Sequence, residues 1–446
     1  MNIQELICTW INYKNLKLAF IHSKAFLDHV LSYKILIFIG LYIFLFNICT
    51  LSQTKLSETS QISLLTCDQG QELYSIFGHS AIRIQDPILN IDWVFNYGTF
   101  DFNTPNFYLK FANGNLNYML SVGEYHRFVQ FYFREERSIR EQILNLTFAE
   151  KQKLFAGLVN NAAPENKFYR YDFFFDNCAT RIRDIVFNSV DGKVLLDSTL
   201  QKNMSFRQLY GEYLKQSPWI EFGIHLLLGV KADYKANAWN EMYLPDYLEQ
   251  QFAHAVINHE NGNRNLVSDT KQVLLFDNNN DGLNDTVITP AFVFWMLFIL
   301  ILILMIFIKS NHLFFRIFDK ILFLAAGLTG LLLTFLWFFT LHKVTQDNYN
   351  ILWASPFSIF LPVLIMNRFV YNKFSRSVLL VNTTGLILML LFWLIIPQEF
   401  PEGLYPLVMI IFVRTGSNLI HSLNIKIINP IISTNIRKRL FFSIIS

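Results

Sequence analysis

The chain has 446 residues, of which 52% are hydrophobic and only 16% are charged, and its formal net charge is +3. Ordinary soluble domains hold roughly 45–50% apolar and 25% charged residues, so part of this chain should lie in a lipid bilayer. The basic residues form no strongly positive block away from the apolar segments, which gives no support to nucleic acid as a partner. The four cysteines include no zinc-type spacing, so no structural metal site is predicted.

Residues 35–52 form the first apolar run, and this run is long enough to span a bilayer. Four lysines precede it, so the positive-inside rule places residues 1–34 in the cytoplasm. A lipoprotein signal is disfavoured because Phe46, Asn47 and Ile48, which precede Cys49, lack the small side chains of a cleavage site. We therefore expect a transmembrane helix or signal anchor over 35–52.

Residues 53–290 are long enough to form a globular domain with its own core. Three short segments rich in Ile, Val, Phe, Tyr and Trp predict strands: "ISLLTC", "HSAIRI" and "DWVFNYG". Helical patterns follow at 127–145 and 149–161, so the domain is predicted to be α+β. The charged residues of "FREERSIREQ" then fall on a helix, where ion pairs between residues i and i+4 are their ordinary role.

His79 stands at the start of the strand "HSAIRI". Side chains alternate along the next strand, so Asp92 and Asn96 share one face of it. Either residue could orient the imidazole of His79, and the pattern alone does not choose between them.

Cys178 lies in "YDFFFDNCATRIRDIVF", where an aromatic strand runs into a predicted helix. Asn177 or Asp176 would be a good N-cap. Cys178 then falls in the first helical turn, where backbone N–H groups and the positive end of the helix dipole favour a thiolate. Together with His79 it would supply the pair that papain-like chemistry requires, in which an imidazole accepts the thiol proton.

The segment 277–285, "DNNNDGLND", resembles a calcium-binding loop. Its oxygen ligands would be Asp277, Asn279, Asp281 and Asp285. The EF-hand pattern fails because the twelfth position is Ile288 and not Glu. A solvated linker is therefore the favoured interpretation, and we predict no metal site.

The last third of the chain predicts five transmembrane helices within residues 291–424. The apolar runs lie near 291–308, 321–341, 353–371, 377–397 and 404–424. Basic residues alternate between successive loops and recur in the tail 425–446, which places both termini in the cytoplasm and residues 53–290 in the periplasm of a bacterial inner membrane. Arg414 falls inside the last run, so either it is functional or the predicted boundary is wrong.

Several segments together resemble a known family. "FGHSAIRI" followed by "DNCATRIRD" is similar to the histidine and cysteine boxes of circularly permuted NlpC-like enzymes and of lecithin:retinol acyltransferase relatives. More closely, most of residues 62–250 resembles the Lnb N-terminal periplasmic domain family of Bacteroidetes, on blocks such as "YSIFGHSAIRI", "FNYGTFDF", "NAAPENKFYRYDFFFDNCATRIRD" and "MYLPDYL". The helical tail with "NILWASP" resembles that family's membrane portion.

The resemblance implies a permuted papain-like (NlpC-like) α+β periplasmic domain followed by an α-helical transmembrane bundle. It also implies a thiol-dependent lipoprotein N-acyltransferase without a cofactor, which moves an acyl chain from a phospholipid to the N-terminal α-amine of a diacylated lipoprotein. Cys178 would be the nucleophile, His79 the general base, and Asn96 or Asp92 the residue that orients His79. Aromatic segments such as "NTPNFYLKF" would suit a surface at the lipid interface, or else fill the core.

Three further residues are candidates for binding substrate. Glu136 and Arg137 lie in a block that resembles the family, and Arg181 lies in the cysteine box. Nothing in their spacing assigns them this role.

Two alternatives remain open from the residues themselves. The first is a periplasmic cysteine peptidase or amidase of cell-wall peptides, which would use the same Cys–His pair. The second is a non-enzymatic membrane protein in which Cys67 and Cys178 form a structural disulfide and the calcium-like loop is the working site.

Overall fold

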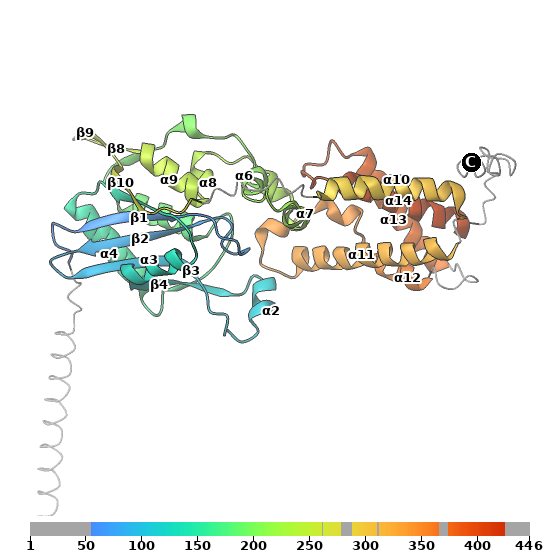
Figure 1. Cartoon of the computed structure of the whole chain (residues 1–446), viewed down its shortest axis with the longest axis horizontal. Helices are drawn as coiled ribbons and strands as arrows, with labels where there is room; N and C mark the ends of the chain where they lie inside the picture. The colour runs from blue at the N-terminus through green and yellow to red at the C-terminus, as the bar shows by residue number, and fades with distance from the viewer. Residues whose placement is uncertain (1–54, 261, 278–287, 310–311, 365–372, 424–446) are drawn as a thin grey trace, which may run out of the picture. The chain divides into compact units, whose positions relative to one another are not determined.

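The computed structural model describes residues 55–260, 262–277, 288–309, 312–364 and 373–423 (Figure 1). The segments predicted over 1–34, 35–52 and 425–446 lie outside these described residues, so the first transmembrane run is not tested. Residues from Leu56 onward form one compact unit, which holds an α+β domain and a bundle of apolar helices. The predicted α+β class is confirmed.

An antiparallel sheet forms the centre of the α+β domain. Its strands lie in the order β10 (Val267–Leu274), β5 (Ile139–Leu144), β1 (Gln61–Cys67), β2 (His79–Asp86), β3 (Ile91–Thr99), β4 (Asn117–Glu124) and β6 (Phe168–Arg170). A second, three-stranded sheet consists of β7 (Lys193–Leu195), β8 (Val256–His259) and β9 (Gly262–Asn265). The strands predicted from the first three alternating segments are β1, β2 and β3, and the register places His79 opposite Cys67.

Short helices connect and cover the strands. They are α2 (Phe107–Ala112), α3 (Tyr125–Arg134), α4 (Phe148–Ala162), α5 (Cys178–Ser189), α6 (Phe206–Glu212), α7 (Pro218–Leu227), α8 (Ala238–Glu241) and α9 (Pro245–His254), with 3₁₀ turns η1 (Ser198–Leu200) and η2 (Val230–Asp233). The predicted helix over 149–161 is α4, which begins with a capping box formed by Thr147 and Glu150.

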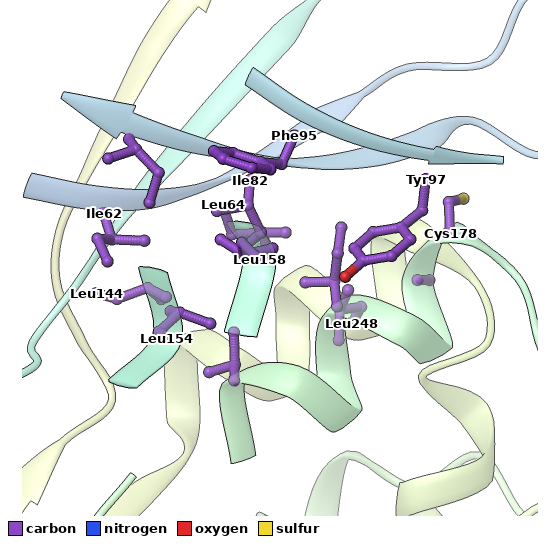
Figure 2. Packing of buried hydrophobic residues seen from close by; sticks show 14 of the residues in the cluster. Ile62, Leu64, Ile82, Phe95, Tyr97, Leu144, Leu154, Leu158, Cys178 and Leu248 are labelled. Atoms are coloured by element: carbon purple, nitrogen blue, oxygen red, sulfur yellow. The ribbon is translucent and has the colours of Figure 1, made fainter. Parts of the chain in front are cut away.

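Both faces of the large sheet are buried. The main core packs one face against α4, α5 and α9, as Figure 2 shows for Leu64 and Ile82 of the sheet and Leu158 of α4. Cys178 belongs to this core and lies beside Tyr97 at one end of it (Figure 2). On the other face, α3 covers a smaller core. This packing fixes the start of α5 against the start of β2, where the two chemically interesting residues meet.

The helix predicted over 127–145 is wrong beyond Arg134. There α3 ends, and β5 enters the sheet between β1 and β10. The charged residues pair across the fold and not along a helix: Glu141 accepts hydrogen bonds of 3.1 Å from Arg83, and Arg140 contacts carboxylates of other elements. These partners are distant in sequence, so a local charge pattern could not reveal them.

Four helices of the C-terminal part are long and apolar enough to cross a membrane: α10 (Pro290–Phe307), α11 (Leu313–Phe338), α13 (Lys373–Leu391) and α14 (Leu404–Ser422). They correspond to the runs predicted at 291–308, 321–341, 377–397 and 404–424. The helix α11 begins eight residues earlier than predicted, because its first turns contain charged residues that lower the local hydropathy.

The run predicted at 353–371 has a different structure where it is described. The chain passes through η3 (Lys343–Thr345), η4 (Tyr349–Leu352), η5 (Pro356–Phe360) and α12 (Leu361–Leu364), and residues 365–372 lie outside the described part. The backbone near Ala354 and Ile359 packs directly on Gly330 and Gly327 of α11, where any Cβ would collide with it. Non-helical backbone is tolerated at membrane depth only where protein buries it in this way.

Arg414 lies inside α14 and forms a buried ion pair with α11. Its Nε and Nη2 atoms donate to the Asp319 carboxylate at 2.7 and 2.8 Å, and Asn418 adds a third donor at 2.8 Å. Arg414 is 0% exposed and Asp319 2% exposed. Arg414 therefore lies within the apolar helix α14 and joins it to α11.

Replacing Arg414 by leucine is expected to lower the free energy of unfolding by about 3–5 kcal/mol, because it leaves the buried Asp319 charge without a cation to pair with. Thermal unfolding of the purified chain in detergent measures this effect. The double variant Arg414→Leu/Asp319→Leu should recover most of the loss, since it removes both charges. Equal stability of native protein and Arg414→Leu would show that the ion pair does not hold α11 and α14 together.

Candidate active site

Cys178 is the first residue of α5, and local hydrogen bonds explain why the helix starts there. The Asn177 side-chain oxygen accepts a hydrogen bond from the backbone N–H of Thr180 at 2.9 Å. The Thr180 hydroxyl in turn accepts one from the backbone N–H of Asn177 at 2.7 Å. The side-chain Nδ2 of Asn177 also donates to the Tyr243 carbonyl at 2.8 Å, and this bond fixes the cap to another segment of the chain. The predicted N-cap is thus Asn177 and not Asp176, and Cys178 lies in the first turn.

His79, the first residue of β2, is hydrogen-bonded on both sides. Its Nε2 atom lies 2.6 Å from Oδ1 of Asn96 on β3. An amide oxygen only accepts, so Nε2 carries the proton and Nδ1 is left for the second partner. That partner is the Cys178 side chain. The structure therefore forms a chain of three side chains in the order Cys178, His79, Asn96.

Asp92, the other sequence candidate for orienting His79, has a different partner. Both its carboxylate oxygens accept from Arg83, at 2.8 Å each. Of the two candidates, Asn96 is the one that contacts the imidazole.

Cys178 and His79 shift each other's charge state. Burial alone would raise the pKa of the Cys178 thiol, but the positive charge of His79 and hydrogen bonds to the sulfur bring this pKa below its ordinary value of 9.0. Two of those hydrogen bonds come from the backbone N–H groups of Ser80 and Ala179. Burial would lower the pKa of His79, yet the Cys178 thiolate raises it above 6.5. The geometry therefore favours a thiolate–imidazolium pair.

Cys67 is not joined to Cys178, since both are free thiols. The structural disulfide considered from the sequence is therefore wrong. Burial raises the pKa of Cys67 to about 12. The two buried thiols thus differ chemically: Cys67 stays protonated, whereas Cys178 is activated.

Of the three substrate-binding candidates, Arg137 and Arg181 have hydrogen-bond partners within the protein. Glu136 lies in the turn between α3 and β5 with a φ of 52°. Arg137 is buried and donates from Nε to the Asp68 carbonyl at 2.8 Å. Arg181 forms two hydrogen bonds with Asp176, at 2.6 and 2.8 Å. The hydrogen bonds of Arg137 and Arg181 are made to other groups of the protein, so they do not indicate a role in substrate binding.

Tyr169 on β6 is a site residue that the sequence did not single out. Its hydroxyl is buried and has no hydrogen-bond partner among the residues that the structure describes. Burial, and then the nearby Cys178 thiolate, raise the pKa of Tyr169, so its hydroxyl remains a proton donor. The Arg181 guanidinium lies 3.6 Å from the centre of its ring and holds it in place.

Gly98 on β3 lets these groups approach one another. Its φ of +87° lies in the left-handed region, and a Cβ there would come within 3.8 Å of both the Cys178 Cβ and the Tyr169 hydroxyl. The ring of Tyr171 would be at 3.3 Å. Gly98, Tyr169 and Tyr171 therefore lie beside Cys178, and the positive φ of residue 98 favours glycine there.

No group of three or more His, Cys, Asp or Glu side chains within the described ranges could hold a metal ion. The calcium-like segment is not tested, because Asn279, Asp281 and Asp285 lie outside the described residues.

Two family models match the chain, and together they cover more than half of it. The Lnb N-terminal periplasmic domain matches residues 50–211, and the Lnb transmembrane domain matches residues 282–426. The first match contains Cys178, His79, Asn96 and Tyr169, and the second contains the four apolar helices. No curated protein and no solved structure matches the chain.

Proposed function

Because this chain belongs to the Lnb family, with both its periplasmic and its transmembrane domain, we propose that it is a thiol-dependent lipoprotein N-acyltransferase. It takes an acyl chain from a phospholipid and transfers it to the N-terminal α-amine of a diacylated lipoprotein. Multiple membrane spans support this choice, because both substrates are lipids that never need to leave the bilayer. We place the protein in a bacterial inner membrane with both termini in the cytoplasm, following the distribution of basic residues between its loops.

One observation carries the proposal: Cys178 at a helix start hydrogen-bonds to His79, whose other nitrogen lies 2.6 Å from Asn96. This arrangement provides an activated nucleophile, a base and a group that orients the base. Histidine on a strand precedes cysteine on a helix that packs against the same sheet, which supports a permuted papain-like fold.

In the first half-reaction the Cys178 thiolate attacks an ester carbonyl of the phospholipid. The tetrahedral oxyanion that forms is stabilised by the amides of the first turn of α5 and by the Tyr169 hydroxyl. When the C–O bond to glycerol breaks, the His79 imidazolium gives its proton to the leaving oxygen. Lysophospholipid departs, and an acyl thioester remains on Cys178.

In the second half-reaction the neutral α-amine of the lipoprotein attacks the thioester carbonyl. Neutral His79 takes the amine proton on Nδ1, the C–S bond breaks, and the thiolate–imidazolium pair is restored. The product is an amide, so the acceptor lipoprotein leaves with a third acyl chain. Water must be excluded during the lifetime of the thioester, and burial of Cys178 serves this purpose.

Reconstitution of the full chain in phospholipid vesicles with a synthetic diacylated lipopeptide tests the reaction class. We expect N-acylated lipopeptide and lysophospholipid in equal amounts, both measured by mass spectrometry. A cysteine peptidase or amidase would use the same three residues, but it would shorten peptides and release no lysophospholipid. If the protein cleaves cell-wall peptides and transfers no acyl chain, our proposal is wrong and the protein is a hydrolase.

Replacing Tyr169 by phenylalanine is expected to lower the rate of acyl transfer by about 10²–10³-fold, as loss of one oxyanion donor does. The ring and its contact with Arg181 remain, so the fold should be unchanged. The turnover rate in vesicles is the measurement, with the alkylation rate of Cys178 as the control for an intact site. A variant that turns over at the native rate would remove Tyr169 from the mechanism.

A further inference from the structure

The helix α2 carries large apolar side chains that the domain does not bury. The structure buries none of its residues. Tyr108 is 81% exposed, Leu109 60% and Phe111 42%, and Phe102 just before the helix is 61% exposed. These four residues are called the α2 patch below. A patch of this kind on a soluble surface marks a site that another apolar body covers.

The α2 patch lies next to the end of a membrane-spanning helix. Leu341, three residues after α11, donates its amide to the Asn113 carbonyl at 3.0 Å. The His342 ring lies 2.9 Å from the Phe111 carbonyl. A Cβ at Gly114, whose φ is +70°, would come within 3.2 Å of the Leu341 Cβ, so the two segments touch closely.

The end of α11 is itself apolar and exposed. Phe338, Phe339 and Leu341 are 63%, 71% and 53% exposed. Aromatic side chains at the end of a membrane span sit at the boundary between lipid and water. Since the α2 patch contacts this same segment, it is placed at the depth of the lipid boundary, and lipid is the occupant that its position favours.

A row of aromatic rings connects the α2 patch with the reactive cysteine. The ring centres of Phe107 and Phe100 are 5.8 Å apart, and those of Phe100 and Tyr118 are 5.3 Å apart. Tyr118 stacks on Tyr171 at 4.6 Å. The Tyr171 ring then reaches the space beside Gly98 that the Cys178 Cβ also borders. Phe107, Phe100, Tyr118 and Tyr171 form the aromatic row.

We propose that the α2 patch and the aromatic row bind the acyl chains of a phospholipid from the leaflet that faces the periplasmic domain. The patch contacts the chains at the bilayer surface, and the row leads the donated chain, with its ester carbonyl, toward Cys178. The chemistry at Cys178 rests on the function proposed above, whereas lipid binding at α2 does not. Aromatic surfaces suit this role because they are apolar and tolerate contact with the headgroup region.

Photo-crosslinking tests lipid binding without needing turnover. A benzoyl-phenylalanine is placed at Tyr108 or, as a matched control, at Phe148, an exposed aromatic residue at the start of α4. Both are made in full-length Cys178→Ala protein in phosphatidylethanolamine vesicles. We expect phospholipid adducts at position 108 to exceed those at 148 by about 10-fold, as measured by mass spectrometry of the labelled peptides. Equal yields at both positions, or adducts to protein alone at 108, would overturn the proposal.

Charges on the α2 patch test its contribution to the reaction. Tyr108→Asp/Leu109→Asp should reduce acyl transfer from vesicle phospholipid by about 10-fold or more, because charged groups weaken burial in the lipid interface. Phe148→Asp should transfer at the native rate. Alkylation of Cys178 should be the same in all three proteins, which excludes a general loss of structure. Native transfer by the double variant contradicts the proposal.

The two proposals can fail separately. If lipid crosslinks at position 108 but the native protein transfers no acyl chain, lipid binding holds and the acyltransferase fails. If the native protein transfers acyl chains but no lipid crosslinks at 108, the acyltransferase holds and the α2 patch is not the donor site.

Discussion

Replacement of Cys178 by alanine is expected to abolish N-acylation of lipoproteins, with a loss of at least about 10⁴-fold in rate, because every step of the mechanism passes through its sulfur. The change removes one atom from a residue that already packs tightly at the start of α5, so the fold should be retained. Mass spectrometry of lipoprotein N-terminal peptides, from cells with native or variant protein at equal abundance, measures the third acyl chain.

Cys67→Ala is the matched control for this experiment. Cys67 is also a buried free thiol, but its raised pKa makes it inert. Transfer should persist in this variant. Full triacylation in Cys178→Ala cells that contain no second transferase would contradict the role of Cys178.

Replacement of His79 by alanine has the second largest expected effect, about 10²–10⁴-fold on transfer, since it removes both the general base and the cation that stabilises the thiolate. The effect on thiol reactivity depends on pH in a defined direction. In the native protein the pKa of Cys178 lies below 9.0, so the thiolate persists at lower pH and is lost as the pH falls through that lowered value. Without His79, burial raises the pKa of Cys178 and only the hydrogen bonds from the backbone N–H groups of Ser80 and Ala179 oppose it.

Alkylation by iodoacetamide as a function of pH measures this shift. The midpoint of the rate profile should move to higher pH in His79→Ala, and the two proteins should differ most near neutral pH. His126→Ala is the control, because His126 is a surface residue whose side chain is 63% exposed. An unchanged midpoint in His79→Ala would mean that His79 does not control the charge of the thiol.

Features set by a few neighbouring residues could be predicted from the sequence. The cap at Asn177 and the helix that follows it are local, and they place Cys178 in the first turn. The alternation of side chains along the strand predicted that Asn96 and Asp92 share one face of β3, but only the positions of their partners in the folded structure distinguish them. Arg83 of the neighbouring strand β2 donates hydrogen bonds to Asp92, whereas Asn96 lies beside His79.

Features that depend on distant partners could not be predicted. The charged pattern after Arg134 resembles a helix, but the segment forms β5, where Glu141 pairs with Arg83 of β2 and Arg140 pairs with Glu249 of α9. Tyr169 is one of many aromatic residues in the domain. What distinguishes it is a hydroxyl buried without a partner near Cys178, and this is visible only once β6 is placed in the sheet.

The predicted membrane runs show the same division. Hydropathy alone found the four long helices, since apolar composition is a property of the local segment. It did not find the short 3₁₀ turns η4 and η5, whose backbone packs on Gly327 and Gly330 of α11. Nor did it find the partner of Arg414, which lies at Asp319 in α11.

Trapping of the acyl-enzyme tests the central claim most directly. The full chain in vesicles is incubated with a phospholipid that carries an alkyne on its acyl chain, in the absence of acceptor lipopeptide, and the labelled peptide is identified by mass spectrometry. Our account predicts one acyl group on Cys178, which neutral hydroxylamine removes as it does other thioesters and which disappears when acceptor lipopeptide is added. Acyl transfer that proceeds with no label on Cys178, or with the label on another residue, would contradict the account.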